Sequence, residues 1–173
     1  MKLARASLFA LLALGACLRA EREPIESPQT ATGEPVQFTF GTIQGGELSS
    51  DTTRGRSTAL LFVTTYDLPS QAEAQMLRDV VHRHKPRANA AIVMMEAPRA
   101  AALAQVWADS LGLELPVAMA SSTLMAGESE LGRILGVPTL IVLDRRGRVV
   151  ERLEGAQGRE RIAEALKRAD VGF

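Results

Sequence analysis

Apolar residues in this chain gather in short runs that alternate with segments of helical spacing. Residues 36–40 alternate apolar and polar side chains, which predicts a half-buried strand. Residues 59–63 and 90–95 are continuous apolar runs, a pattern typical of strands covered on both faces. Each run is followed by a segment with apolar side chains at helical intervals, over 70–84 and 100–111. This part of the chain therefore predicts strands that alternate with helices.

The same spacing predicts which helix faces point inward. The expected inward residues are Ala74, Leu77, Val80 and Val81 on the first helix, and Leu103, Val106, Trp107 and Leu111 on the second. Two short segments follow, a strand over 115–119 and a helix over 128–135.

The C-terminal third predicts a hairpin and a last helix. Residues 139–143 and 148–153 have strand character, and the polar residues 144–147 between them are typical of a turn. An amphipathic helix is expected over 159–168, with its inward residues being Ile162, Ala165 and Leu166. Strands and helices in this order imply a mixed sheet sandwiched by helices, which is an α/β class.

The N-terminus has the organisation of a secretory signal peptide. Lys2 and Arg5 precede an apolar run over 8–14, which is too short to span a bilayer. Residues 14–17, Leu-Gly-Ala-Cys, resemble the lipobox of bacterial lipoproteins. This resemblance implies cleavage after residue 16, acylation of Cys17 and stable anchoring by several acyl chains. An ordinary signal peptide with an incidental cysteine is the alternative.

Charge and composition restrict what the rest of the chain can do. Residues 17–35 are polar and broken by three prolines, which predicts a lipidated N-terminus followed by a flexible tether. Without Lys2 and Arg5, the mature chain keeps 18 of the 20 basic side chains against 20 acidic ones. A charge of about −2 by this count gives no field suited to nucleic acid, which we exclude as a partner. Residues 36–173 suit one domain.

Three segments of this domain resemble TlpA-like thiol–disulfide oxidoreductases of the redoxin family. They are Phe38-Thr39-Phe40 with Gly46-Glu47-Leu48 and Arg54-Gly55-Arg56, then 62–70, and then Gly136-Val137-Pro138-Thr139 with 144–148. The resemblance implies a thioredoxin-like three-layer α/β/α sandwich with a mixed central sheet. It also implies a cis peptide bond between Val137 and Pro138, facing the loop over 66–70.

The active-site loop departs from the family's pattern. The family has an aromatic residue followed by C-x-P-C at a helix start, whereas this chain has Tyr66, Asp67, Leu68, Pro69 and Ser70. Neither a carboxylate nor a hydroxyl can carry out thiol–disulfide exchange. The chain's single cysteine is the proposed lipid attachment site. We therefore expect no catalytic residues and no intrinsic thiol redox activity.

The residues that replace the thiols have two interpretations. Asp67 caps the helix that follows, or Asp67 and Ser70 line a polar recognition site with Tyr66. Val137 and Pro138 are either retained for the fold alone or form the edge at which an extended peptide pairs, as the resemblance implies.

No cofactor or metal is expected. His82 and His84 are two residues apart near a helix end and point to different faces, so they are poor joint ligands. Methionines can bind copper, but more often they fill cores. The candidates are Met94, Met95, Met119 and Met125.

The resulting hypothesis is a redox-inactive, membrane-anchored lipoprotein that binds an extended peptide or a partner protein of the cell envelope. The alternatives are an oxidoreductase-family enzyme that works with a partner's thiols, and a purely structural thioredoxin-like domain. Leu18 stands where lipoproteins retained in the inner membrane commonly have aspartate. The expected location is therefore the periplasmic side of the envelope, with the outer membrane favoured.

Overall fold

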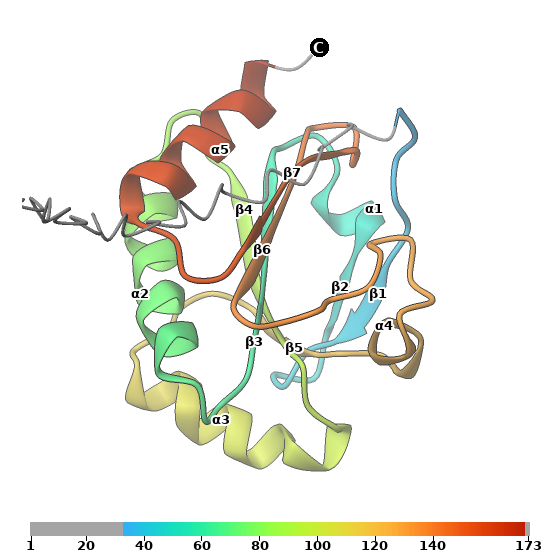
Figure 1. Cartoon of the computed structure of the whole chain (residues 1–173), viewed down its shortest axis with the longest axis vertical. Helices are drawn as coiled ribbons and strands as arrows, with labels where there is room; N and C mark the ends of the chain where they lie inside the picture. Colours follow the sequence, from blue (N-terminus) through green and yellow to red (C-terminus); the bar gives the residue numbers. More distant parts are fainter. Residues whose placement is uncertain (1–32, 172–173) are drawn as a thin grey trace, which may run out of the picture.

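The computed structural model describes residues 33–171, which form a mixed sheet with helices packed on it (Figure 1). The proposed signal peptide, Cys17 and most of the tether lie outside this range. The elements are β1 (Thr39–Gly41), β2 (Glu47–Ser49), α1 (Ser50–Thr53), β3 (Thr58–Val63), α2 (Leu68–Arg83), β4 (Asn89–Met94), the 3-10 helix η1 (Pro98–Ala100), α3 (Ala101–Ser110), β5 (Val117–Met119), α4 (Ser122–Ala126), β6 (Thr139–Leu143), β7 (Val149–Glu154) and α5 (Arg159–Val171).

The central sheet has the strand order β5-β4-β3-β6-β7. β3, β4 and β5 are parallel, whereas β6 and β7 run antiparallel to their neighbours. The β1–β2 hairpin forms a separate two-stranded sheet that is linked to β5 through a bridge between Thr42 and Ala118. All residues of β3 are buried, as expected for the central strand of a sheet covered on both faces.

Two apolar cores lie on opposite faces of the sheet. One core joins the inward side chains of α2, α3 and α5 to alternate residues of the strands. The second core packs the β1–β2 hairpin, α4 and the loop after α4 on the other face. The predicted α/β/α arrangement is therefore present, with a hairpin and one short helix in place of a full second helical layer.

The predicted strands are present, but the first is shorter than expected. Val36, Phe38 and Phe40 are buried and alternate with exposed residues, as the pattern predicts. The strand itself begins only at Thr39. Ahead of it, the Val36 N–H donates a 2.9 Å hydrogen bond to the carbonyl of Gly147 in the β6–β7 turn. The chain thus enters the fold at this turn.

The helix predicted over 128–135 is wrong. A short helix forms earlier, as α4, because the Ser121 hydroxyl accepts a hydrogen bond from the N–H of Leu124 and caps its start. Gly127, at φ 78°, ends α4 in the left-handed conformation that glycine tolerates best. Gly132 adopts φ 76°, which is incompatible with a helix through this segment.

The predicted inward stripe of the second helix is also partly wrong. α3 buries Ala104, Trp107 and Ala108, whereas Leu103 and Val106 are 55% and 65% exposed. The buried face of α3 thus consists of two alanines and a tryptophan, and the larger aliphatic side chains remain outside. The inward residues predicted for the last helix are correct, since Ile162, Ala165 and Leu166 are fully buried.

Candidate binding site

The loop between β3 and α2 is held by a cap at the start of α2. Asp67 is the N-cap, and its Oδ2 accepts hydrogen bonds from the Ser70 N–H at 2.8 Å and from the Ser70 hydroxyl at 2.5 Å. Pro69 lies in the first turn, where its missing N–H leaves no helix hydrogen bond unmade. The predicted capping role of Asp67 is confirmed.

This geometry limits the chemistry of Asp67 and Ser70. Ser70 is fully buried, and its hydroxyl is already bound to Asp67. A buried hydroxyl that donates to a helix-capping carboxylate is a structural group and is poorly placed to attack a substrate. The pair therefore rigidifies the loop, and the outward residues of the loop are available for contacts.

A second set of hydrogen bonds fixes the beginning of the same loop. Glu96, just after β4, accepts from the Thr65 N–H at 2.9 Å and from the Thr65 hydroxyl at 2.8 Å. The Gln71 side-chain amide donates to the Thr65 carbonyl at 3.3 Å. The sequence analysis did not find Glu96, because only the parallel pairing of β3 with β4 brings residues 31 positions apart together.

The segment before β6 lies beside this loop. The Val137–Pro138 peptide bond is cis, and Thr139 pairs with Phe62 at the end of β3. The Pro138 carbonyl accepts from the Gly155 N–H at 2.9 Å, and the Gly136 carbonyl accepts from the Thr139 hydroxyl at 2.7 Å. Within residues 33–171, neither the N–H nor the carbonyl of Val137 has a hydrogen-bond partner.

A buried acid lies one turn further along α2. Glu73 is fully buried, and its Oε2 accepts a 3.0 Å hydrogen bond from the Gln157 N–H, while its Oε1 has no partner among the described residues. Burial raises the pKa of Glu73 to about 7, and the hydrogen bond from Gln157 opposes that rise only in part. The sequence analysis missed this residue, although a glutamate beside Ala74 on the inward face was a usable signal.

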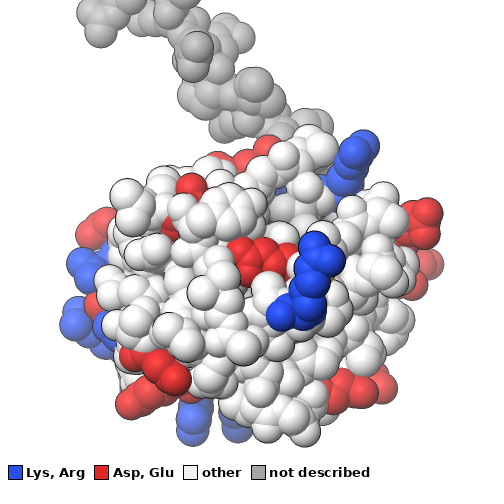
Figure 2. Space-filling model, turned by 90° about the horizontal axis from the view of Figure 1, so that it is seen from below, with Lys and Arg blue, Asp and Glu red and all other residues white. Residues whose placement is uncertain are grey.

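The same end of the sheet presents apolar side chains to solvent. Tyr66, Leu68 and Leu135 are 80%, 74% and 74% exposed. Tyr66 and Leu135 lie in loops, and Leu68 begins α2. Leu103 and Val106 of α3 and Met125 of α4 are also exposed. Figure 2 views the molecule from this side, and most of the surface there is uncharged. A wide uncharged surface with protruding apolar groups is typical of an interaction site.

The other candidate ligands do not form a metal site. His82 lies 3.6 Å from Glu114 on the surface, whereas His84 is buried and lies 2.6 Å from Asp170. Met94 and Met119 belong to the core behind α2 and α3. In the part of the chain that the structure describes, no group of three or more potential metal-binding side chains occurs, and no helix is long and apolar enough to cross a membrane.

These features together define a thioredoxin-like domain. A strand ends in a loop and capped helix, and the antiparallel strand beside it begins at a cis-proline. Among curated proteins, the chain is similar to the thiol-disulfide oxidoreductase ResA of Bacillus thuringiensis and of Bacillus anthracis. Each is 23% identical over 135 residues, which is 78% of this chain and 76% of the relative. No protein-family model matches the chain.

Solved structures agree with this assignment. A thiol:disulfide interchange protein of the thioredoxin family from Chlorobium tepidum superimposes with a TM-score of 0.67 and 21% identity, over 79% of this chain and 94% of its own. The pneumococcal exposed lipoprotein thioredoxin Etrx1 from Streptococcus pneumoniae gives a TM-score of 0.61 and 18% identity, over 76% and 98%. The thioredoxin-like fold predicted from the sequence is confirmed.

Proposed function

We propose that this protein is a membrane-anchored, redox-inactive thioredoxin-like lipoprotein that binds an extended peptide segment of an envelope protein. The peptide would contact the Tyr66–Ser70 loop and pair with the backbone at Val137–Pro138.

The unpaired backbone of Val137 is the observation that carries the proposal. An N–H and a carbonyl without partners, beside the end of a strand, suit the addition of an extended peptide by main-chain hydrogen bonds. The exposed side chains of Tyr66, Leu68 and Leu135 would supply apolar contacts for alternate residues of that peptide. The two anchors of the loop, at Asp67 and Glu96, support a surface that is ordered before binding.

The absence of catalytic thiols supports binding over redox chemistry. The chain has one cysteine, Cys17, and the two positions that hold thiols in the family are Asp67 and Ser70. An enzyme of the family that acts only through a partner's thiols is the alternative, and a purely structural domain is another. Reduction of insulin by the purified protein tests the enzymatic alternative, because measurable turnover would contradict a binding-only function.

The N-terminus and the relatives support a location outside the cytoplasm. The Leu-Gly-Ala-Cys sequence at residues 14–17 supports lipid attachment at Cys17 outside the cytoplasm, and one solved relative is described as an exposed lipoprotein. Inhibition of lipoprotein signal peptidase should leave the longer precursor. Unchanged processing would contradict the lipid anchor and, with it, the favoured outer-membrane location.

The peptide-binding proposal can be tested with a permanently unfolded chain. Reduced and carboxymethylated α-lactalbumin offers extended segments and no free thiols. We expect the purified protein to bind it, and Leu68→Ser to weaken binding by about tenfold, the equivalent of about 1.4 kcal/mol. Burial of one leucine side chain supports a loss of this size.

Val171 provides a matched control for this experiment. It is 79% exposed, similar to Leu68, but it ends α5 at the opposite end of the sheet. Val171→Ser should bind the unfolded chain as the unmodified protein does. Equal losses in both variants would indicate a general loss of surface hydrophobicity and would contradict a site at the Tyr66–Ser70 loop.

A further inference from the structure

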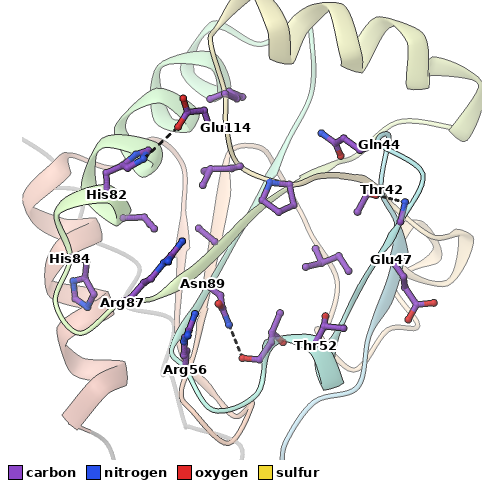
Figure 3. Close-up of a pocket in the computed structure, with 18 of the residues that line it drawn as sticks. Thr42, Gln44, Glu47, Thr52, Arg56, His82, His84, Arg87, Asn89 and Glu114 are labelled. Carbon is purple, nitrogen blue, oxygen red and sulfur yellow. Dashed lines mark hydrogen bonds and ion pairs between the residues drawn. The ribbon is translucent and has the colours of Figure 1, made fainter.

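A large cavity lies at the end of the sheet opposite the Tyr66–Ser70 loop. Its volume is about 950 Å³, and it is bounded by the end of α2, the start of β4, the β1–β2 hairpin and the loop before β5. Figure 3 shows this cavity with Arg56, Arg87 and His82 on the side of α2, and with Thr42 and Glu47 on the hairpin. No part of the proposed peptide site contributes to it.

Two arginines are held next to each other in this cavity by the strand register. Thr58 pairs with Asn89 at the start of β3 and β4, and the Asn89 N–H donates to the Ser57 carbonyl at 2.8 Å. Two residues before this pair, the segments that lead into β3 and β4 carry Arg56 and Arg87, and both arginines line the same side of the cavity (Figure 3). Like charges on the same side of a cavity repel each other.

The charge of these arginines is not neutralised by any residue that the structure describes. Within residues 33–171, Arg56, Arg87 and the exposed Lys85 that also lines the cavity have no carboxylate within ion-pair distance.

The other charged groups of the cavity do not pair with these three cations. Glu114 lies near His82, and Glu47 lies on the hairpin, across the cavity from the arginines (Figure 3). His84 is paired with Asp170. One wall of the cavity therefore carries three cations that have no counterion among residues 33–171.

We propose that this cavity binds the phosphate group of a ligand. Guanidinium groups present planar pairs of N–H donors that match phosphate oxygens. The two guanidinium groups and the Lys85 ammonium together match the charge of a phosphate dianion better than that of a carboxylate, which carries one negative charge. The phosphate can come from a soluble phosphorylated compound or from a lipid headgroup. A lipid headgroup could reach the cavity because the N-terminal segment enters the fold at the same end of the sheet, where the Val36 N–H donates to the Gly147 carbonyl. Only this lipid source depends on the proposed anchor at Cys17.

The test uses the mature chain from residue 17 with Cys17→Ser, so that no acyl chain inserts into vesicles. Inorganic phosphate and glycerol 3-phosphate are titrated by calorimetry. Sedimentation with vesicles of phosphatidylglycerol, compared with phosphatidylcholine, tests the headgroup. Saturable binding in either experiment, weakened by salt, supports the site, and the responding probe identifies the source. No binding to any of these probes would overturn the proposal.

Arginine variants locate the binding. We expect Arg56→Gln and Arg87→Gln each to lower the affinity about tenfold or more, as for loss of a charge-assisted hydrogen bond. Arg99→Gln is the matched control, because Arg99 is also exposed and without an ion-pair partner among the described residues, but lies in η1 at the other end of the sheet.

A thermal experiment keeps the test independent of folding defects. Phosphate should raise the unfolding temperature of the unmodified chain and of Arg99→Gln, but not that of Arg87→Gln. Equal responses of the three chains would contradict the assignment. Failure here would leave the peptide proposal untouched, since that proposal concerns the opposite end of the sheet.

Discussion

The buried carboxyl of Glu73 gives the most direct test of the site's electrostatics. Its pKa is raised from 4.5 to about 7, mainly by burial. The folded protein therefore binds a proton more tightly at this group than the unfolded chain does. The protonated Glu73 therefore favours the folded state. This contribution to the free energy of unfolding is fully present below about pH 4.5 and is lost as the pH rises through about 7.

The magnitude follows from the size of the shift. A shift of about 2.5 units, at 1.36 kcal/mol per unit, corresponds to about 3 kcal/mol lost once the pH is above 7. Between pH 5 and pH 8 the loss is about 2–3 kcal/mol, because part of it has already occurred at pH 5. Domains are stable by about 5–15 kcal/mol, so a change of this size is readily measured.

The assay is urea unfolding of the unmodified protein and of Glu73→Gln at pH 5 and pH 8. The glutamine cannot ionise, yet its side-chain carbonyl can still accept the hydrogen bond from Gln157. We expect the variant to gain about 2–3 kcal/mol relative to the unmodified protein on going from pH 5 to pH 8. Glu128→Gln, at an exposed glutamate, is the control and should follow the unmodified protein.

Parallel stability curves for the unmodified protein and Glu73→Gln would refute this reasoning. They would mean that Glu73 ionises alike in the folded and unfolded chains. A carbon-13 NMR titration of the Glu73 carboxyl gives a second, direct measurement, with a midpoint expected at about 7.

Two further predictions concern the start of α2. Asp67→Ala removes the acceptor for the Ser70 N–H and hydroxyl, so we expect a loss of about 1–2 kcal/mol in urea unfolding, with Asp67→Asn losing less. Asp67→Cys with Ser70→Cys should form a disulfide in oxidising buffer and reduce insulin, because the two side chains already touch at 2.5 Å. Mass spectrometry detects the disulfide, the insulin assay measures the reduction, and Asp67→Cys alone is the control. A double variant that keeps two free thiols in oxidising buffer would show that the loop is wrongly aligned with the family.

The sequence predicted the parts of the fold that depend on local patterns. The apolar runs of β3, β4 and β6 and the spacing in α2 and α5 located these elements to within a few residues. The cap at Asp67 was also predictable, because an acidic residue two positions before a proline at a helix start has a local mechanism.

The errors arose where local patterns were ambiguous. Over 128–135 the apolar residues permitted a helix, but Gly132 has a positive φ that a continuous helix does not allow. On α3, hydrophobicity favoured Leu103 and Val106 as inward residues, whereas the structure buries two alanines and one tryptophan. Binary patterns count apolar residues, but they do not measure the space available to them.

By itself, the sequence determined the fold class and the capped loop at the start of α2. Only the tertiary structure brought Glu96 to Thr65, Gln157 to Glu73 and Arg87 beside Arg56. Strand pairing and burial decide these contacts, because they join residues far apart in the chain and set the solvation of each charge. The apolar surface at one end of the sheet and the unpaired cations at the other are for the same reason properties of the folded domain.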